Sequence, residues 1–182
     1  FLPVVALSHA LTANDTLYGS VGRGFETPTL AEMSYSANSS GMNTSLQPSV
    51  STQFELGYRQ RLTGDVKGMW SAAVFHSSTK DEIVTDANGT GGGRSVYKNA
   101  GKTRRIGAEL QADIKLSRQW DVQAGYTYLD AQFREGDNAG NKLPGLSKQS
   151  AFVGVNFRPT PEWRLGVSAQ HASKVFVKDD NK

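Results

Sequence analysis

The sequence predicts an all-β protein, and more closely an antiparallel transmembrane β-barrel of the outer-membrane type. Three observations lead to this prediction. Connections between strand-like segments alternate between short and long, apolar and polar residues alternate within the segments, and the tryptophans share one position relative to the short connections. These features indicate a sheet with short turns at one end and long loops at the other, and with one apolar and one polar face.

The connections fall into two kinds. Clusters of turn-forming residues make the short ones, at 12–15, 63–65, 117–119 and 159–162. The long ones are polar and rich in Gly, Asn and Ser, at 25–49, 84–94 and 134–147. Tight turns at one end of a barrel and extended loops at the other are typical of outer-membrane barrels.

Eight strands follow from these boundaries, at 2–11, 16–24, 50–62, 66–83, 95–116, 120–133, 148–158 and 163–177. The segment 106–116 shows the clearest alternation, with Ile106, Leu110 and Ile114 on one face and Glu109 and Asp113 on the other. A soluble sheet packed on a core gives the same pattern, so that alternative stays open. The fourth and fifth strands exceed the roughly 10 residues that cross a bilayer, and we expect them to project beyond it.

The tryptophans Trp70, Trp120 and Trp163 each follow a short turn within a few residues. An indole prefers the membrane–water boundary, so they predict an aromatic ring on the turn side. The opposite ring is expected from residues toward the far ends of the strands, namely Tyr126, Tyr128, Phe133 and Phe176. Tryptophan also packs well at strand starts in soluble β-proteins, which is the alternative.

Composition excludes several other classes of protein. Mean hydropathy is negative, and no apolar segment approaches the roughly 20 residues of a membrane helix. The net charge of +3 is scattered without a basic stripe, so we expect no nucleic-acid partner. His9, His76 and His171 lie far apart, Cys is absent and no hydrolase motif occurs, so we expect neither an enzyme, a metal site nor a cofactor. No signal peptide is visible at Phe1.

Five segments resemble sequence motifs of the TonB-dependent receptors. In chain order they are 18–32 (YGSVGRGFETPTLAE), 43–58 (NTSLQPSVSTQFELGY), 97–109 (YKNAGKTRRIGAE), 125–131 (GYTYLDA) and 143–148 (LPGLSK). Ser49 departs from the pattern, because Glu is usual there. The resemblance covers nearly the whole chain and implies that residues 1–182 form a partial barrel domain, about eight strands of an incomplete 22-stranded barrel. The plug domain and the closing strands are expected to be absent. A small complete eight-stranded barrel, acting as a membrane anchor or adhesin, is the alternative.

The resemblance implies a receptor in the outer membrane of a Gram-negative bacterium, in contact with outer-membrane lipid. Such a receptor captures a scarce nutrient, most often a ferric siderophore or another small anionic ligand, for import driven by TonB through the missing plug. A subgroup linked to pyrroloquinoline quinone uptake is similar in the segments at 22–28, 81–84 and 97–105, and gives an alternative cargo.

Candidate cargo-binding residues follow from two properties: the position of a residue along its strand, and whether the alternation places its side chain on the lumen side. If Ile106 faces lipid, then Tyr97, Asn99 and Arg105 face the lumen on the extracellular half of their strand, with Arg94 in the loop above. Phe25 and Tyr35 belong to the longest loop, where aromatic side chains suit closure over a flat ligand. The alternative for Arg105 is a pair with a lumen or plug carboxylate.

A second group of polar side chains is expected on the lower lumen wall. This group comprises Glu55, Arg59, Glu109, Asp113 and Arg164. We interpret these residues as the ordinary solvation of a wet interior.

Overall fold

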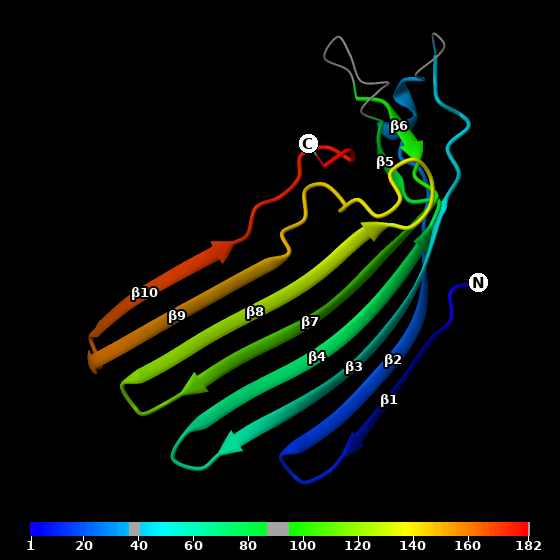
Figure 1. The fold of residues 1–182 in the computed structure, drawn as a ribbon. Helices are drawn as coiled ribbons and strands as arrows, with labels where there is room; N and C mark the ends of the chain where they lie inside the picture. The colour runs from blue at the N-terminus through cyan, green and yellow to red at the C-terminus, as the bar shows by residue number, and fades with distance from the viewer. Residues whose placement is uncertain (37–40, 87–94, 182) are drawn as a thin grey trace.

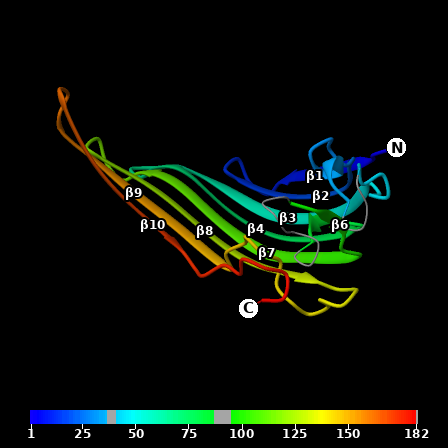
Figure 2. The same ribbon diagram turned by 90° about the horizontal axis from the view of Figure 1, so that it is seen from above.

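An eight-stranded antiparallel sheet forms most of the protein. In this computed structural model, residues 1–36, 41–86 and 95–181 are described. The strands of the sheet are β1 (Val4–Ala10), β2 (Asp15–Glu26), β3 (Ser49–Thr63), β4 (Lys67–Lys80), β7 (Lys102–Lys115), β8 (Trp120–Phe133), β9 (Gln149–Thr160) and β10 (Trp163–Ala172). They lie in the order β1-β2-β3-β4-β7-β8-β9-β10, and the sheet curves like a section of barrel wall (Figures 1 and 2). The fold class and the eight wall strands are as the sequence predicts.

Two smaller elements lie beyond the sheet. The strands β5 (Ile83–Thr85) and β6 (Tyr97–Asn99) form a two-stranded ribbon, and a short 3₁₀ helix, η1, spans Glu32–Ser34. In the part of the chain that the structure describes, no helix has the length and apolar character needed to cross a membrane.

All four short turns lie at one end of the sheet, and the ribbon and long loops lie at the other (Figure 1). We call these the turn end and the loop end. In the first turn, the Thr12 hydroxyl oxygen accepts hydrogen bonds from the N–H groups of Asn14 and Asp15, both at 3.1 Å. Ser117 accepts two such bonds in the third turn. These hydroxyl oxygens accept hydrogen bonds from backbone N–H groups that would otherwise have no partner in a tight turn.

The pairing register assigns every strand residue to one of two faces, because directly paired residues point the same way. Ile106 is paired with His76 and, on its other side, with Asp130, whereas Glu109 is paired with Ala73 and Thr127. We call the face of Ile106 the outer face and the face of Glu109 the inner face. The inner face carries all five residues predicted for the lower lumen wall, namely Glu55, Arg59, Glu109, Asp113 and Arg164.

The tryptophans lie on the outer face near the turn end, as predicted. The Trp70 indole stacks obliquely on Tyr58 with ring centroids 5.3 Å apart, and its N–H donates to the Gln60 amide oxygen at 2.8 Å. Trp120 stacks on Phe157 with centroids 4.3 Å apart. The prediction for Phe133 is wrong, because this side chain is 2% exposed. It packs with Ala131 and Leu143 in a small apolar cluster at the loop end instead of facing outward.

The fourth and fifth predicted strands are each divided in two. Asp81 (φ 55°) separates β4 from β5, and Gly101 (φ 70°) separates β6 from β7. Lys80 pairs with Lys102 before the break and Ile83 pairs with Asn99 after it, so the register continues and the two left-handed residues lie opposite each other. Both arms of the hairpin therefore bend at paired positions, and β5 and β6 leave the wall as a separate ribbon (Figure 1). The predicted extension of the last strand to 177 is also wrong, since β10 ends at Ala172.

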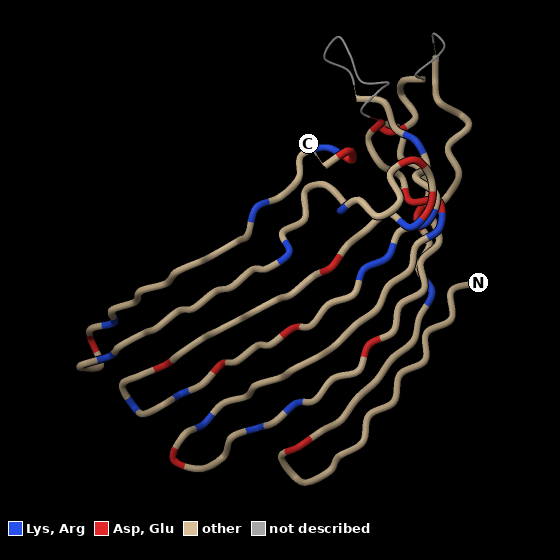
Figure 3. Tube along the Cα trace, viewed as in Figure 1, with Lys and Arg blue, Asp and Glu red and all other residues tan. Residues whose placement is uncertain are grey.

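Charged residues are distributed unevenly over the wall. The middles of β1, β2, β9 and β10 carry no Lys, Arg, Asp or Glu, whereas such residues gather toward the strand ends and in the outer loops (Figure 3). The central strands are the exception, because Glu55 of β3 and Glu109 of β7 lie midway along them. The charged part of the inner surface midway along the wall therefore lies on β3 and β7.

We predict that alanine at Gly107 destabilises the wall by about 1–3 kcal/mol, because an added Cβ would lie 2.4 Å from the Phe75 ring and 2.5 Å from the Tyr128 carbonyl oxygen. At Gly57 the three atoms nearest to the added Cβ all belong to the Tyr18 side chain, which can rotate, so the cost there is expected to be smaller. Gly64 has nothing within 4 Å and is the matched control. The thermal unfolding midpoint of the protein that carries this segment measures the difference. Equal midpoints for Gly107→Ala and Gly64→Ala would contradict the close packing.

Candidate functional site

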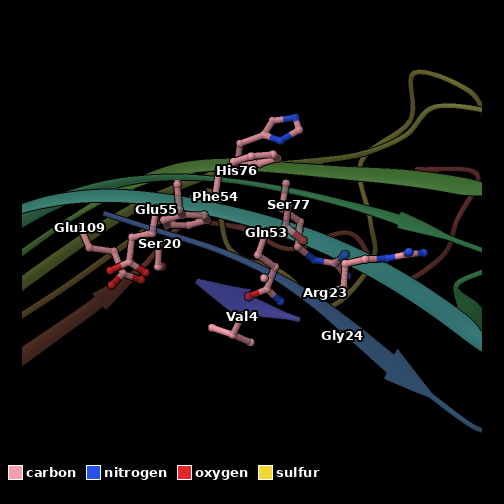
Figure 4. Close-up of a pocket in the computed structure, with 13 residues that line it drawn as sticks. Val4, Ser20, Arg23, Gly24, Gln53, Phe54, Glu55, His76, Ser77 and Glu109 are labelled. Carbon is pink, nitrogen blue, oxygen red and sulfur yellow. The ribbon is translucent and has the colours of Figure 1, made fainter. Parts of the chain in front are cut away.

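A groove of about 450 Å³ lies on the sheet between β1 and β7, toward the loop end. Its polar lining comes mainly from the inner face, with Gln53 and Glu55 on β3, Ser77 on β4 and Arg105 on β7. Figure 4 shows Glu55 and Glu109 on one side of the sheet and His76 on the other. The groove therefore offers hydrogen-bond donors and acceptors to whatever enters from the loop end.

Two glycines of the inner face are covered by aromatic rings, and one of these rings, Phe75, lines the groove. The Tyr18 ring lies across Gly57, and the Phe75 ring lies across Gly107. Each ring occupies the space that a Cβ would need, which is the usual way that a glycine in a strand is covered by an aromatic neighbour. The segments Glu55-Leu-Gly57 and Gly107-Ala-Glu109, part of the resemblance described above, therefore pair an acidic side chain with an aromatic shelf.

A polar cluster surrounds the Tyr18 shelf. Glu55 and Glu109 are close enough to the Tyr18 hydroxyl to act on it electrostatically, and the Arg59 guanidinium lies 5.5 Å from the centre of the Tyr18 ring. Figure 4 shows the carboxylates of Glu55 and Glu109 near each other. Among the described residues no group of three or more His, Cys, Asp or Glu side chains is arranged to hold a metal ion. The cluster can accept and donate hydrogen bonds along the wall.

Arg105 lies at the upper end of the groove and faces inward, as predicted. Its guanidinium is held by both carboxylate oxygens of Glu82, at 2.5 Å and 2.9 Å. The Thr103 hydroxyl also bonds Glu82. Glu82 lies just beyond the kink, so this bidentate pair fastens the ribbon to the wall. The prediction that Arg105 pairs with a carboxylate and the prediction that it faces the cargo space are thus both compatible with its geometry.

Asn99 and Tyr97 lie in β6, away from the eight-stranded sheet. They bond the loop that precedes β3, and Asn99 also bonds the kink. The Asn99 amide nitrogen donates to the carbonyls of Gln47 (2.8 Å) and Asp81 (2.7 Å), and its oxygen accepts from the Gln47 N–H at 2.8 Å. The Tyr97 carbonyl accepts from the Asn43 amide at 2.9 Å. Two of the segments that carry the resemblance, 43–58 and 97–109, are therefore docked on each other.

The aromatic candidates are separated from this group. Phe25 is the penultimate residue of β2, shares the outer face with Val21 and is 52% exposed, so it is not in the loop where we expected it. Tyr35 caps the end of η1 and is 43% exposed. Arg94 falls outside the described residues. The structure thus brings Tyr97, Asn99 and Arg105 together around the kink and leaves Phe25 on the opposite face.

Sequence reasoning missed several residues of the groove and its rim. Gln53 and Ser77 share the inner face with Arg105, and counting the alternation along their strands would have identified them. Glu82 and Asn43 had no such signal, since their partners lie 23 and 54 positions away in the chain.

Comparison with known proteins identifies relatives along the whole chain. The family model described as TonB dependent receptor-like, beta-barrel matches residues 1–182. The chain is 24% identical, over 94% of its length, to a probable TonB-dependent siderophore receptor, PiuA, of Acinetobacter baumannii, and covers 25% of that protein. It is 26% identical, over 75% of its length, to the ferrioxamine receptor of Yersinia enterocolitica, and covers 19% of that protein.

Solved structures share the fold. The ferric yersiniabactin uptake receptor FyuA of Yersinia pestis aligns with 100% of this chain at a TM-score of 0.75 and 22% identity, and the chain covers 27% of it. The ferric citrate transporter FecA aligns with 99% at a TM-score of 0.74 and 24% identity, and the chain covers 26% of it. The chain thus spans about a quarter of the length of the proteins that it matches.

We predict that Asn99→Asp loosens the rim more than Asn99→Ala does, because a second acceptor would then face the carbonyls of Gln47 and Asp81. Hydrogen exchange at the Gln47 amide, which donates to Asn99, is the measurement. Asn14→Ala, in a turn at the far end of the sheet, is the control. Unchanged exchange at Gln47 in both Asn99 variants would show that the loop is held by other contacts.

Proposed function

This chain belongs to the TonB-dependent receptor β-barrel family of the Gram-negative outer membrane, and from this premise we propose that it is the wall section of a receptor that captures a ferric siderophore for TonB-driven import. The relatives named above are receptors and transporters, not enzymes. The observation that carries the proposal is the position of Arg105 in an inward-facing polar groove below the loop-end rim.

The wall needs further strands to close. The strands β1 and β10 are at opposite edges of the sheet and do not pair with each other. Unpaired backbone groups at a sheet edge are too costly to leave in hydrocarbon, so each edge requires a neighbouring strand. We propose that these strands, and a plug domain that contacts TonB, come from other parts of a longer receptor. The open sheet gives no support to a small complete eight-stranded barrel.

The two faces and two ends give the orientation. We propose that the outer face contacts lipid. The three tryptophans Trp70, Trp120 and Trp163 then form an aromatic belt at the periplasmic boundary of the membrane. The tight turns then face the periplasm, and the ribbon and long loops face the outside. The groove opens toward the loop end, on the side from which a nutrient arrives.

The chemistry of the groove fits an anionic chelate. A guanidinium binds carboxylate or catecholate oxygens through two parallel hydrogen bonds. The Phe75 ring, which lines the groove together with Arg105, gives a flat apolar surface. The Glu82 carboxylate holds Arg105 in place while no cargo is bound. A cargo oxygen that replaces one Glu82 oxygen would accept a hydrogen bond from a guanidinium that is already oriented.

A binding assay on the complete receptor tests the cargo. Quenching of tryptophan fluorescence is measured with catecholate, hydroxamate and carboxylate ferric siderophores, with the iron-free chelators, and with pyrroloquinoline quinone. We expect submicromolar affinity for at least one ferric siderophore and much weaker binding of its iron-free form. Binding of pyrroloquinoline quinone alone would replace the siderophore by that cargo, and affinity for none of these compounds would remove the proposal.

We predict that Arg105→Ala lowers cargo affinity by about 10- to 100-fold, the usual range for a lost hydrogen bond to a charged group. Glu82→Gln is the matched variant, since it removes the carboxylate and leaves the guanidinium in the groove. A residue that binds cargo predicts a loss in Arg105→Ala only. A residue that only fastens the ribbon predicts an equal loss in both variants, and that result would exclude Arg105 from the cargo site.

A further inference from the structure

One carboxylate lies alone on the outer face near the turn end. Among the Asp, Glu, Lys and Arg residues of the eight described strands, only Asp15 has outer-face parity in the turn-end half. The other outer-face charges belong to the loop-end half, and these are Arg23, Lys80, Lys102, Arg104 and Asp130. A carboxylate beside hydrocarbon is costly unless polar or charged groups satisfy it.

Three uncharged side chains position the Asp15 carboxylate. Its Oδ1 accepts a hydrogen bond from the Tyr58 hydroxyl at 2.5 Å and another from the Gln60 amide at 2.9 Å, and its Oδ2 accepts one from the Thr12 hydroxyl. A carboxylate has about four acceptor positions, so one remains on Oδ2. Within the described part of the chain, Asp15 takes part in no ion pair. The carboxylate is therefore held in place while its charge is not neutralised.

Two aromatic rings are fixed beside this carboxylate. The Tyr58 hydroxyl bonds Asp15 directly, and the Trp70 indole N–H bonds Gln60, which itself bonds Asp15. The two rings are tilted by 51°, with centroids 5.3 Å apart. Aromatic rings attract cations, and the indole of tryptophan does so most strongly. A carboxylate with a Tyr and a Trp ring beside it has the chemistry that binds an ammonium group.

A second groove, of about 400 Å³, adjoins this cluster on the same face, and we call it the outer groove. It begins at Tyr58 and at Leu17, which is two residues along β2 from Asp15. Small side chains, Ala72 and Ala108, lie between larger ones along its length. Its outer-face lining consists of Leu17, Leu56, Tyr58, Ala72, Val74, Ala108, Leu110 and Tyr126. Its other lining residues have inner-face parity, and these are Gly57, Ala73 and Glu109.

The length and chemistry of the outer groove suit an acyl chain. Its lining comes from β2, β3, β4, β7 and β8, which are neighbours in the sheet. At roughly 4.8 Å per strand, the outer groove extends for about 19 Å. All eight of its outer-face side chains are apolar apart from the Tyr58 and Tyr126 hydroxyls, and the Tyr58 hydroxyl is already bonded to Asp15. One extended hydrocarbon chain therefore fits along it.

Charge complementarity selects the headgroup of the lipid. In the orientation proposed above, the tryptophans mark the periplasmic boundary, so Asp15 lies at the height of the headgroups of the inner leaflet. No Lys or Arg of the eight strands lies on this half of the outer face, so an anionic headgroup meets a carboxylate and no cation. A headgroup that ends in an ammonium ion is attracted to Asp15 instead.

We propose that Asp15, Tyr58 and Trp70, together with the outer groove, bind one phospholipid with an ethanolamine headgroup in the inner leaflet. The ammonium group donates a hydrogen bond to the Asp15 Oδ2 and lies against the aromatic rings. The phosphate stays in the water of the headgroup layer, and one acyl chain lies over Ala72 and Ala108. This site rests on the orientation given under the proposed function and not on the identity of the cargo.

The test uses the complete receptor in detergent micelles that contain either phosphatidylethanolamine or phosphatidylglycerol, with identical acyl chains. Native mass spectrometry counts the lipid that each sample retains. The headgroup variant is Asp15→Asn, which keeps the shape and an acceptor oxygen but removes the charge. Its matched control is Asp113→Asn, because Asp113 lies at the same end of the wall, faces inward and accepts a hydrogen bond from Gln123 at 3.2 Å.

We expect wild type to retain phosphatidylethanolamine about three- to tenfold more than phosphatidylglycerol, the range for an exposed ion pair together with a cation–π contact. Asp15→Asn is expected to remove this preference, and Asp113→Asn to keep it. A carboxylate that only closes the turn predicts a lower thermal unfolding midpoint in Asp15→Asn with the preference unchanged. That result, or equal retention of the two lipids by wild type, would overturn the proposal.

A second pair of variants tests the outer groove. Ala72→Leu fills its floor and is expected to lower the retention of both lipids severalfold without changing their ratio. Ala151→Leu adds the same volume in the same row of the outer face but outside the outer groove, and is expected to retain both lipids normally. Equal retention by these two variants would contradict the proposed acyl-chain position.

Cargo affinity is measured in the same four variants and is expected to equal that of wild type, because none of the changed side chains lines the groove that contains Arg105. A receptor that shows the expected lipid preference but binds no siderophore would overturn the proposed cargo alone. A receptor that binds siderophore but retains both lipids equally would overturn the lipid site alone.

Discussion

Backbone pairing is the constraint on which the rest of this wall depends. Eight neighbouring strands bond each other along lengths of 7 to 15 residues, and this pairing fixes the register on both sides of each inner strand. Because side chains alternate with period two, a fixed register also fixes which residues face inward and which face outward. The polar groove on the inner face and the tryptophans on the outer face are both consequences of this alternation.

At the kink formed by Asp81 and Gly101 the chain leaves the eight-stranded sheet. Beyond it, the alternation of inner and outer faces no longer determines where side chains lie. Both hairpin arms enter the left-handed region at paired positions, so the ribbon keeps its register but leaves the wall. Asn99 then bonds the Asp81 carbonyl, and Glu82 returns to Arg105 on the wall. Beyond the kink, these side-chain bonds hold the ribbon in place of pairing with the eight-stranded sheet.

The sequence was sufficient for the strand count, the turns and the faces, because these depend on local turn residues and on alternation. The same alternation places Phe25 with Val21 on the outer face, but the polar composition of 25–49 assigned it to the long connection instead. The kink was not predictable in this way, since Asp81 carries no glycine-like signal and each arm reads as a continuous strand. The pair between Glu82 and Arg105 depends on that kink, so it was inaccessible too.

Arg105 and Arg104 are neighbours in the chain and illustrate how one alternation serves two surfaces. Arg105 faces inward and is neutralised by two bonds from Glu82, whereas Arg104 faces outward and shares a single distant carboxylate with Lys142. The inner guanidinium is therefore preorganised, and a ligand must compete with Glu82 for it. The outer guanidinium makes only long contacts with Asp130 and Gln132, and its buried Nε has no hydrogen-bond partner. A change that slipped the register of β7 by one residue would exchange these environments and place Arg104, without its carboxylate, in the groove, so both environments depend on the same strand pairing.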